Sequence, residues 1–204
     1  MTLEEGQFLV KLARRAFETY VKQHVKIDVP KDTPAKLLEK SGVFVTLSTV
    51  TPTGEKRLRG CIGFPLPHFP LAQATIEAAI SSATMDPRFP PVTESEIDNI
   101  VVEVTVLTPP NLIKVDDPKE YPSKIKVGKH GLIIERGPYK GLLLPQVPVD
   151  WNWDEEEFLC ECCIKAGLSP DSWCDKKTKV YCFEGIIYEE ESPRGKIVER
   201  PLTK

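Results

Sequence analysis

The residues best suited to chemistry lie in one string, Leu58-Arg59-Gly60-Cys61-Ile62-Gly63, which otherwise has the character of a buried strand. Side chains alternate between the two faces of a strand, so Arg59 and Cys61 are expected on one face. An arginine beside a cysteine stabilises the thiolate and lowers the thiol pKa, which favours a nucleophilic or redox role for Cys61. The two glycines indicate a bulge, a bend, or the close approach of a backbone or a ligand.

The same string also has a structural interpretation. Free cysteine is often a small buried apolar residue, arginine often pairs with a carboxylate, and glycine often serves packing alone. No histidine is adjacent to Cys61. The nearest candidate for acid-base work is His68, in the proline-rich loop after the strand, where a solvent-exposed position is the alternative. The catalytic and the structural interpretation of Cys61 both stay open.

Two other segments place polar residues between prolines. Asp86-Pro87-Arg88-Phe89-Pro90-Pro91 predicts a rigid turn after a helix, which either positions a site or contains only a local ion pair. Gln146 follows Pro145 directly. Since polar groups recur in three conformationally restricted strings, we predict one cleft between two subdomains, with Cys61 as its candidate catalytic residue. The predicted ligand-binding residues are Arg59, Gly60, Asp86, Arg88 and Gln146.

The remaining cysteines form a second group that requires an explanation. Cys160, Cys162 and Cys163 fall in one predicted helix, with Cys174 and Cys182 downstream. Only Cys160 and Cys163 share a helical face and no histidine lies nearby, so the spacing argues against a metal site. Buried free thiols and a disulfide from Cys160 or Cys163 to Cys174 are the alternatives. The sequence specifies no cofactor.

Composition limits the class of protein. The chain has 204 residues, 41% of them hydrophobic and 28% charged, which is typical of one soluble domain or two packed subdomains. A net charge of -3 predicts no broad attraction to nucleic acid, and no apolar stretch is long enough for a membrane span. A charged first helix in place of an apolar signal core favours the cytoplasm. Nineteen prolines, abundant Lys and Glu, and few Asn and Gln favour a thermophilic source.

Local patterns predict an α+β protein. Capping boxes begin at Thr2 and Thr93, and Asp154 has the sequence pattern of a third helix cap. Alternating β-branched residues and glycine turns indicate a hairpin and a small meander, with an irregular connection over 111–123 between them. The predicted helices span 3–22, 35–40, 71–84, a short segment after Thr93, and a segment from Asp154 to Gly167. The predicted strands span 43–50, 56–64, 100–108, 124–127, 132–135, 142–144 and 178–190, followed by a polar tail.

Four strings together resemble the AMMECR family: 58–63 and 86–91 as quoted above, Gly141-Leu142-Leu143-Leu144-Pro145-Gln146-Val147, and Trp153-Asp154-Glu155-Glu156-Glu157-Phe158. The resemblance covers about 5–197 and, with the composition, suggests an archaeal member. It implies an α+β protein of two intimately packed subdomains, each a mainly antiparallel sheet with helices on one face. We expect a single unit over 1–204, with one subdomain of 1–115 plus the strand 178–190 and another of 120–175.

The resemblance implies no established activity and no agreed catalytic residues. Family members are sometimes encoded with, or fused to, a Memo-like protein, so such a pathway protein is an expected partner. Two hypotheses follow. The chain is an enzyme-like binder of a small molecule around 58–63, with Cys61 a conditionally reactive cysteine. Alternatively, it is a regulatory or scaffold module that binds a protein through Trp151, Trp153 and the proline-rich loop.

Overall fold

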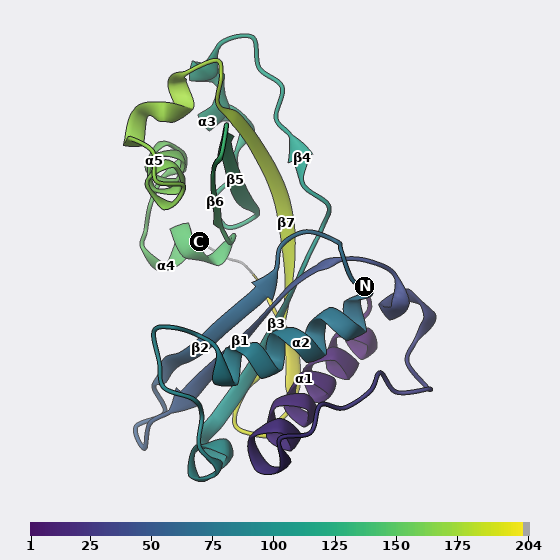
Figure 1. Ribbon diagram of the computed structural model, residues 1–204. Coiled ribbons are helices and arrows are strands. Elements are labelled where there is room, and N and C mark those ends of the chain that lie inside the picture. The colour runs from purple at the N-terminus through teal and green to yellow at the C-terminus, as the bar shows by residue number, and fades with distance from the viewer. Residues whose placement is uncertain (202–204) are drawn as a thin grey trace. The chain divides into compact units, whose positions relative to one another are not determined.

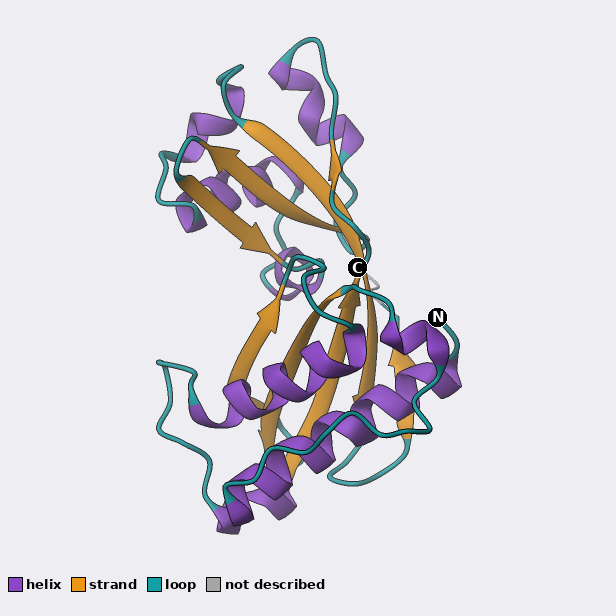
Figure 2. Ribbon diagram, turned by 45° about the vertical axis from the view of Figure 1, so that its right-hand side comes forward, coloured by secondary structure: helices purple, strands orange, loops and turns teal. Residues whose placement is uncertain are grey.

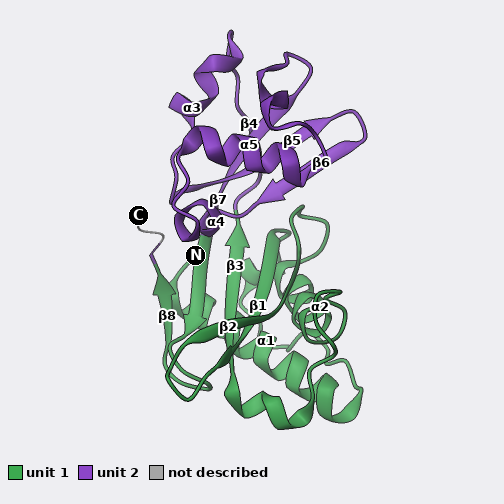
Figure 3. Ribbon diagram, turned by 90° about the vertical axis from the view of Figure 1, so that its left-hand side faces the viewer, with its two compact units in different colours: residues 1–107, 186–200 green, residues 108–185, 201–204 purple. Residues whose placement is uncertain are grey.

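The computed structural model describes residues 1–201 and divides into two compact units (Figure 3). Unit 1 comprises residues 1–107 and 186–200, and unit 2 comprises residues 108–185 with Pro201. Helices and antiparallel strand pairs occur in both units, which confirms the predicted α+β class. The units share one long strand, β7 (Lys179–Glu190), whose residues from Ile186 onward belong to unit 1.

Unit 1 consists of one sheet with two helices along one face (Figure 1). Its strands follow the order β2-β1-β3-β7, and β8 pairs with β7. The helices α1 and α2 pack on each other and on the sheet, and Val43, Val45 and Leu47 are fully buried in their shared core. The elements are α1 (Leu3–Gln23), β1 (Gly42–Val50), β2 (Lys56–Phe64), α2 (Leu71–Thr84), β3 (Ile100–Leu107) and β8 (Ile197–Arg200).

The unit 1 sheet is curled away from its helices. Lys56 Nζ, on β2, donates to a Glu189 carboxylate oxygen at 3.1 Å and to the Glu190 carbonyl oxygen at 3.3 Å on β7. Two strands, β1 and β3, separate β2 from β7 in the strand order, so only a curled sheet lets a lysine side chain reach across them. Residues that alternate with the buried core positions therefore lie on a face that carries no helix in unit 1.

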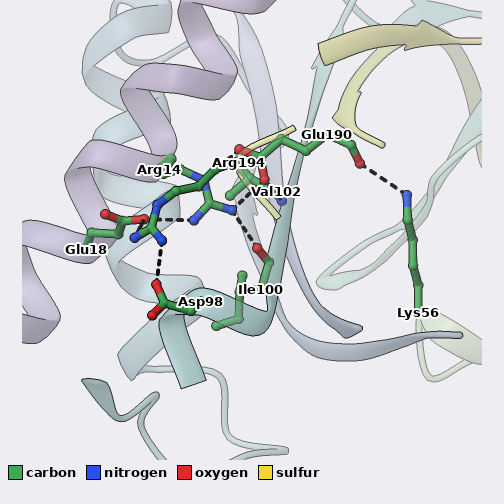
Figure 4. Close-up of polar contacts among 8 residues, drawn as sticks. All are labelled: Arg14, Glu18, Lys56, Asp98, Ile100, Val102, Glu190 and Arg194. Carbon is green, nitrogen blue, oxygen red and sulfur yellow. Dashed lines mark hydrogen bonds and ion pairs between the residues drawn. The ribbon is translucent and has the colours of Figure 1, made fainter. Parts of the chain in front are cut away.

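A buried ion pair joins α1 to the sheet (Figure 4). Arg14 Nε and Nη2 donate to the two carboxylate oxygens of Glu190 at 2.6 and 2.5 Å, and Nη2 also donates to the Ile100 carbonyl oxygen. Glu190 accepts a further hydrogen bond from the Val102 backbone N–H at 3.0 Å. These contacts fix α1 against β3 and β7, and they satisfy both buried charges, as burial of an ion pair requires.

Unit 2 is a smaller sheet covered by α5, visible in the view coloured by secondary structure (Figure 2). The strand β7 pairs with β4 and β5, and β5 pairs with β6. Asp154 caps α5 by accepting hydrogen bonds from the backbone N–H groups of Glu156 and Glu157, as its sequence pattern predicts. The elements are β4 (Asn111–Leu112), α3 (Tyr121–Lys124), β5 (His130–Arg136), β6 (Tyr139–Leu143), α4 (Gln146–Asp150) and α5 (Glu155–Lys165).

Three local predictions are wrong. The strand expected over 124–127 is absent. The short helix α3, with Pro122 in its first turn, extends to Lys124, and the chain continues in turns that bury Ile125 and Val127 without a strand partner. The strand β4 has only two residues and carries too little signal to be predicted. The polar tail contains β8, which pairs with β7 as the second arm of a hairpin.

None of the helices within residues 1–201 is long and apolar enough to cross a membrane.

Candidate functional site

The strand register lines up three side chains around Cys61. Cys61 on β2 lies opposite Thr46 on β1, and Thr46 lies opposite Glu103 on β3. Thr46 alternates with the buried core residues Val45 and Leu47, so the three side chains share the helix-free face of the sheet. The Thr46 hydroxyl donates a hydrogen bond of 3.3 Å to the Cys61 thiol. We call Cys61, Thr46 and Glu103 the thiol row.

Arg59 does not belong to the thiol row. The register pairs Gly60 with Leu47 and Leu58 with Ser48, which leaves Arg59 as an extra residue in a β-bulge. The prediction that Arg59 and Cys61 share a face is therefore wrong, because the bulge interrupts the alternation between them.

The contacts of Arg59 show where its guanidinium group goes instead. Nε donates to Glu96 at 2.6 Å, and Nη1 and Nη2 donate to the carbonyl oxygens of Pro90 and Pro91 at 2.9 and 3.3 Å. Only 11% of the side chain is exposed. Arg59 thus holds the loop 86–91 and the 3-10 helix Glu94–Asn99 against β2, and its role in ligand binding stays a prediction.

Gly60 allows α2 to approach the strand very closely. A Cβ at this position would lie 2.0 Å from the carbonyl oxygen of Ser82. The Ser82 hydroxyl donates to the Val45 carbonyl oxygen at 2.7 Å and accepts from the Ile62 backbone N–H at 2.8 Å. Of the alternatives left open for this glycine, the structure shows the close approach of a backbone, next to the bulge at Arg59.

Asp86 connects the loop after α2 to the strand that carries the thiol. Its carboxylate accepts hydrogen bonds from the Cys61 backbone N–H at 2.8 Å and from Arg88 Nε and Nη2 at 2.9 and 2.7 Å. The hydrogen bonds from Arg88 hold the pKa of Asp86 well below its usual range. Asp86 is buried whereas 53% of the Arg88 side chain is exposed. The structure therefore brings Cys61, Asp86 and Arg88 together: Asp86 and Arg88 form the ion pair that the structural interpretation expected, and the Cys61 backbone N–H donates to the same carboxylate.

The electrostatics of Cys61 differ from the prediction. Burial raises the pKa of the Cys61 thiol, and the hydrogen bond from Thr46 opposes this effect only in part. The negative charges of Glu103 and Asp86 raise this pKa further, whereas Arg88 lowers it. The expected activation of the thiol by an adjacent arginine is therefore wrong in sign, because desolvation outweighs the nearby guanidinium group. The resting thiol is protonated at neutral pH.

Glu103 is a site residue that the sequence analysis missed. Its carboxylate accepts hydrogen bonds from Arg200 Nη2 at 2.7 Å and from the Thr105 hydroxyl at 3.4 Å, and its side chain is 15% exposed. Burial raises the pKa of Glu103, and Arg200 opposes this effect. One signal was present in the sequence: Glu103 interrupts the apolar run Ile100–Leu107 between two valines.

Gln146 belongs to unit 2, where it begins the short helix α4. It is 8% exposed, and its amide oxygen has no hydrogen-bond partner among residues 1–201. A buried amide oxygen without a partner is unusual and costs free energy. The predicted convergence of Gln146 with Cys61 on one cleft stays a prediction.

The cysteine group of unit 2 has the features of packing residues. All six cysteines of the chain, which lie within residues 1–201, are free thiols, and Cys162 and Cys163 are buried. Burial raises the pKa of Cys162 to about 12 and that of Cys163 to about 11, which suppresses their reactivity. Within the described part of the chain, no group of His, Cys, Asp and Glu side chains is arranged to hold a metal ion.

Comparison with known proteins gives a consistent family match. The family model described as AMMECR1 matches residues 10–188. The archaeal protein PH0010 of Pyrococcus horikoshii is 62% identical over 199 residues, covering 98% of this chain and 96% of the relative. Protein MJ0810 of Methanocaldococcus jannaschii is 55% identical over 202 residues, covering 99% and 98%. The crystal structure of uncharacterized protein PH0010 matches with a TM-score of 0.92 over 97% of each chain.

Proposed function

Since the chain belongs to the AMMECR1 family, and the names of its matched relatives state no activity, we propose its function from the geometry of the thiol row. The protein binds a small molecule on the helix-free face of the unit 1 sheet in the manner of an enzyme, with Cys61 as the reactive group. The observation that carries this proposal is the register of Cys61, Thr46 and Glu103 across three adjacent strands.

Stability alone does not account for this row. A largely buried carboxylate with a raised pKa costs free energy, and acids with perturbed pKa values are characteristic of functional sites. The neighbouring strand positions that face the helices are apolar and fully buried, as a structural sheet favours. Asp86 holds the Cys61 backbone, so the thiol is presented from a fixed position.

Thermal-shift screening of a metabolite library tests the proposal. A ligand present at ~100 times its dissociation constant stabilises the folded state by about 2.7 kcal/mol. We expect a hit that raises the melting temperature of the wild type but not of Cys61→Ala or Glu103→Gln. Cys182→Ala is the matched control, because Cys182 is also half-buried but belongs to unit 2. Hits that shift all four proteins equally, or no hit at all, would contradict binding at the thiol row.

An exposed tryptophan supports a second candidate, a module that binds a protein partner. Trp151 is 70% exposed and stacks on Trp153, with ring centroids 6.1 Å apart and an interplanar angle of 18°. Trp153 is half-buried and packs on the unit 2 core. A rigid exposed indole is typical of a binding hot spot.

Titration calorimetry with a purified Memo-like protein tests this candidate. If Trp151 is the anchor, Trp151→Ser abolishes the heat of binding. Tyr139→Ser, which changes another exposed aromatic residue of unit 2, leaves it unchanged. Equal binding by both variants would rule out the tryptophan as the contact.

A further inference from the structure

We propose that Glu103 on β3 controls whether the Cys61 thiol on β2 is ionised, with Thr46 on β1 between them. This inference rests on the proposed function, because it concerns the regulation of the same site. It assigns a positioning role to Glu103, which acts through Cys61.

The geometry places the two groups on one face without a direct hydrogen bond. Neighbouring strands lie roughly 4.8 Å apart, so the backbones of β2 and β3 are about 10 Å apart across β1. The curl of the sheet toward this face, shown by the reach of Lys56 to Glu189, brings the side-chain ends closer than the backbones. The Thr46 hydroxyl uses its single proton on the Cys61 sulfur, so Glu103 acts on the thiol through its charge.

The other charges of unit 1 near the thiol leave Glu103 as the variable one. On the loop after α2, Asp86 is tied to Arg88 by two hydrogen bonds, and the pKa of Asp86 lies well below its usual range. Both members of that pair, Asp86 and Arg88, therefore stay ionised at neutral pH. On β3, burial raises the pKa of Glu103, which brings its protonation closer to neutral pH.

Further charges surround Glu103 from β8, β7 and β2. Arg200 donates to Glu103 at 2.7 Å and lies 3.8 Å from the Glu189 carboxylate, and Lys56 donates to that carboxylate at 3.1 Å. Arg200 stabilises the ionised form of Glu103, whereas Glu189 opposes it. Burial and Glu189 thus favour the neutral form of Glu103 and Arg200 favours the charged form, so a charged group that binds beside these residues changes the electrostatic environment of Glu103.

A consequence is that the reactivity of the thiol increases when a suitable ligand binds. While Glu103 is ionised, its negative charge keeps the proton on the Cys61 sulfur. When a ligand brings a protonated nitrogen group to Glu103, the negative charge is offset, the pKa of Cys61 falls and a larger fraction of the thiol ionises; the proton passes to water and the electron pair stays on sulfur. No oxidant or reductant takes part in this step. The chemical class of ligand that the row favours is therefore a small cation, such as a protonated amine.

The test follows alkylation of Cys61 by iodoacetamide between pH 6 and pH 10, resolved by peptide mass spectrometry. Glu103→Gln keeps the shape of the side chain and removes its charge, and Thr46→Val removes the hydrogen bond to sulfur. Glu94→Gln is the matched control, because Glu94 is an exposed carboxylate of the same unit. Cys174, exposed in unit 2, is the internal reference in every sample. All labelling is done below the measured melting temperature of each variant.

We expect opposite shifts from the two variants. A thiol pKa lowered by one unit gives about ten times more thiolate, and the accompanying loss of nucleophilicity reduces the gain in rate to roughly threefold. Glu103→Gln therefore labels Cys61 faster at pH 7, by roughly threefold for each unit by which its midpoint falls, whereas Thr46→Val labels it more slowly, with a higher midpoint. Glu94→Gln matches the wild type.

Two results would overturn the inference alone. One is an unchanged midpoint in Glu103→Gln, and the other is equal acceleration in both variants, which would indicate loosened packing. If Glu103→Gln does not fold, Thr46→Val carries the test, and an unchanged midpoint there counts against the row. Failure of native Cys61 to react anywhere in the pH range would overturn the proposed function as well, so the two failures are distinguishable.

Discussion

The backbone N–H of Cys61 donates a hydrogen bond of 2.8 Å to the buried carboxylate of Asp86, twenty-five residues further along the chain. Through this bond the loop that follows α2 is anchored to the strand that carries the thiol. Arg88 completes the anchor by donating two side-chain hydrogen bonds to the same carboxylate. The position of Cys61 therefore depends on a contact between two strings that are separate in the sequence.

Replacing Asp86 tests this anchor. Asp86→Asn removes the charge from an acceptor of four hydrogen bonds, so we expect a loss of about 1–3 kcal/mol in the free energy of unfolding. Urea denaturation at neutral pH measures the loss. Asp32→Asn, at an exposed position in the same unit, is the control and is expected within ~0.5 kcal/mol of the wild type. A loss no larger than that of the control would show that the contact is not an anchor.

The pH dependence of stability follows from the pKa values of Asp86 and Glu96. Hydrogen bonds from Arg88 depress the pKa of Asp86, and those from Arg59 lower the pKa of Glu96 to about 2. A carboxyl with a depressed folded-state pKa contributes stability that is present above its unfolded-state pKa, roughly 4, and is lost as pH falls through the folded value. The wild type therefore loses stability below about pH 4. Acid titration followed by circular dichroism should show a shallower decline in the double variant Asp86→Asn, Glu96→Gln.

Replacing Arg59 tests whether this residue has a structural role or acts on the thiol. We expect Arg59→Met to cost about 1–3 kcal/mol, because it breaks hydrogen bonds to Glu96 and to two carbonyl oxygens. The midpoint of Cys61 alkylation should stay unchanged. Arg57→Met, which breaks an exposed ion pair two residues away, is the control and should cost less than ~1 kcal/mol. A marked shift of the alkylation midpoint in Arg59→Met would show that Arg59 does act on the thiol.

Gly60 is predicted to tolerate no side chain. In Gly60→Ala the new methyl group would lie 2.0 Å from the Ser82 carbonyl oxygen, so α2 must move, at a cost of about 3 kcal/mol or more. Gly54→Ala is the comparison, since Gly54 has φ +85° but nothing within 4 Å of the added atom. That variant should cost only about 1–2 kcal/mol of backbone strain. Thermal unfolding ranks the two, and equal losses would exclude the steric explanation.

The buried pair of Arg14 and Glu190 is expected to be the most sensitive polar contact of unit 1. Arg14→Met leaves the Glu190 carboxylate buried without its guanidinium partner, so we expect a loss of about 3–5 kcal/mol. Arg15→Met on the same helix is the control, because Arg15 is exposed. Chemical denaturation of both variants decides the matter, and similar midpoints would show that the pair contributes little.

Much of the secondary structure was predictable because its signals are local. The capping box of Thr2 and Glu5, the alternation in Gly42–Val50 and the cap at Asp154 act within a few residues, so each predicts its element without knowledge of the rest. The rigid turn of Asp86 and Arg88 was predictable for the same reason. Where the local signal was weak or ambiguous, as in residues 124–127 and β8, the prediction failed.

The sequence by itself determined the family and the α+β class, and it singled out Cys61 as a candidate. Only the tertiary structure decided which side chains face the thiol. One bulge at Arg59 interrupts the alternation of β2, and the register of three strands then brings Thr46 and Glu103 into line with Cys61. Register depends on the pairing of segments far apart in the chain and on the close packing of α2 over Gly60, and no local pattern contains that information.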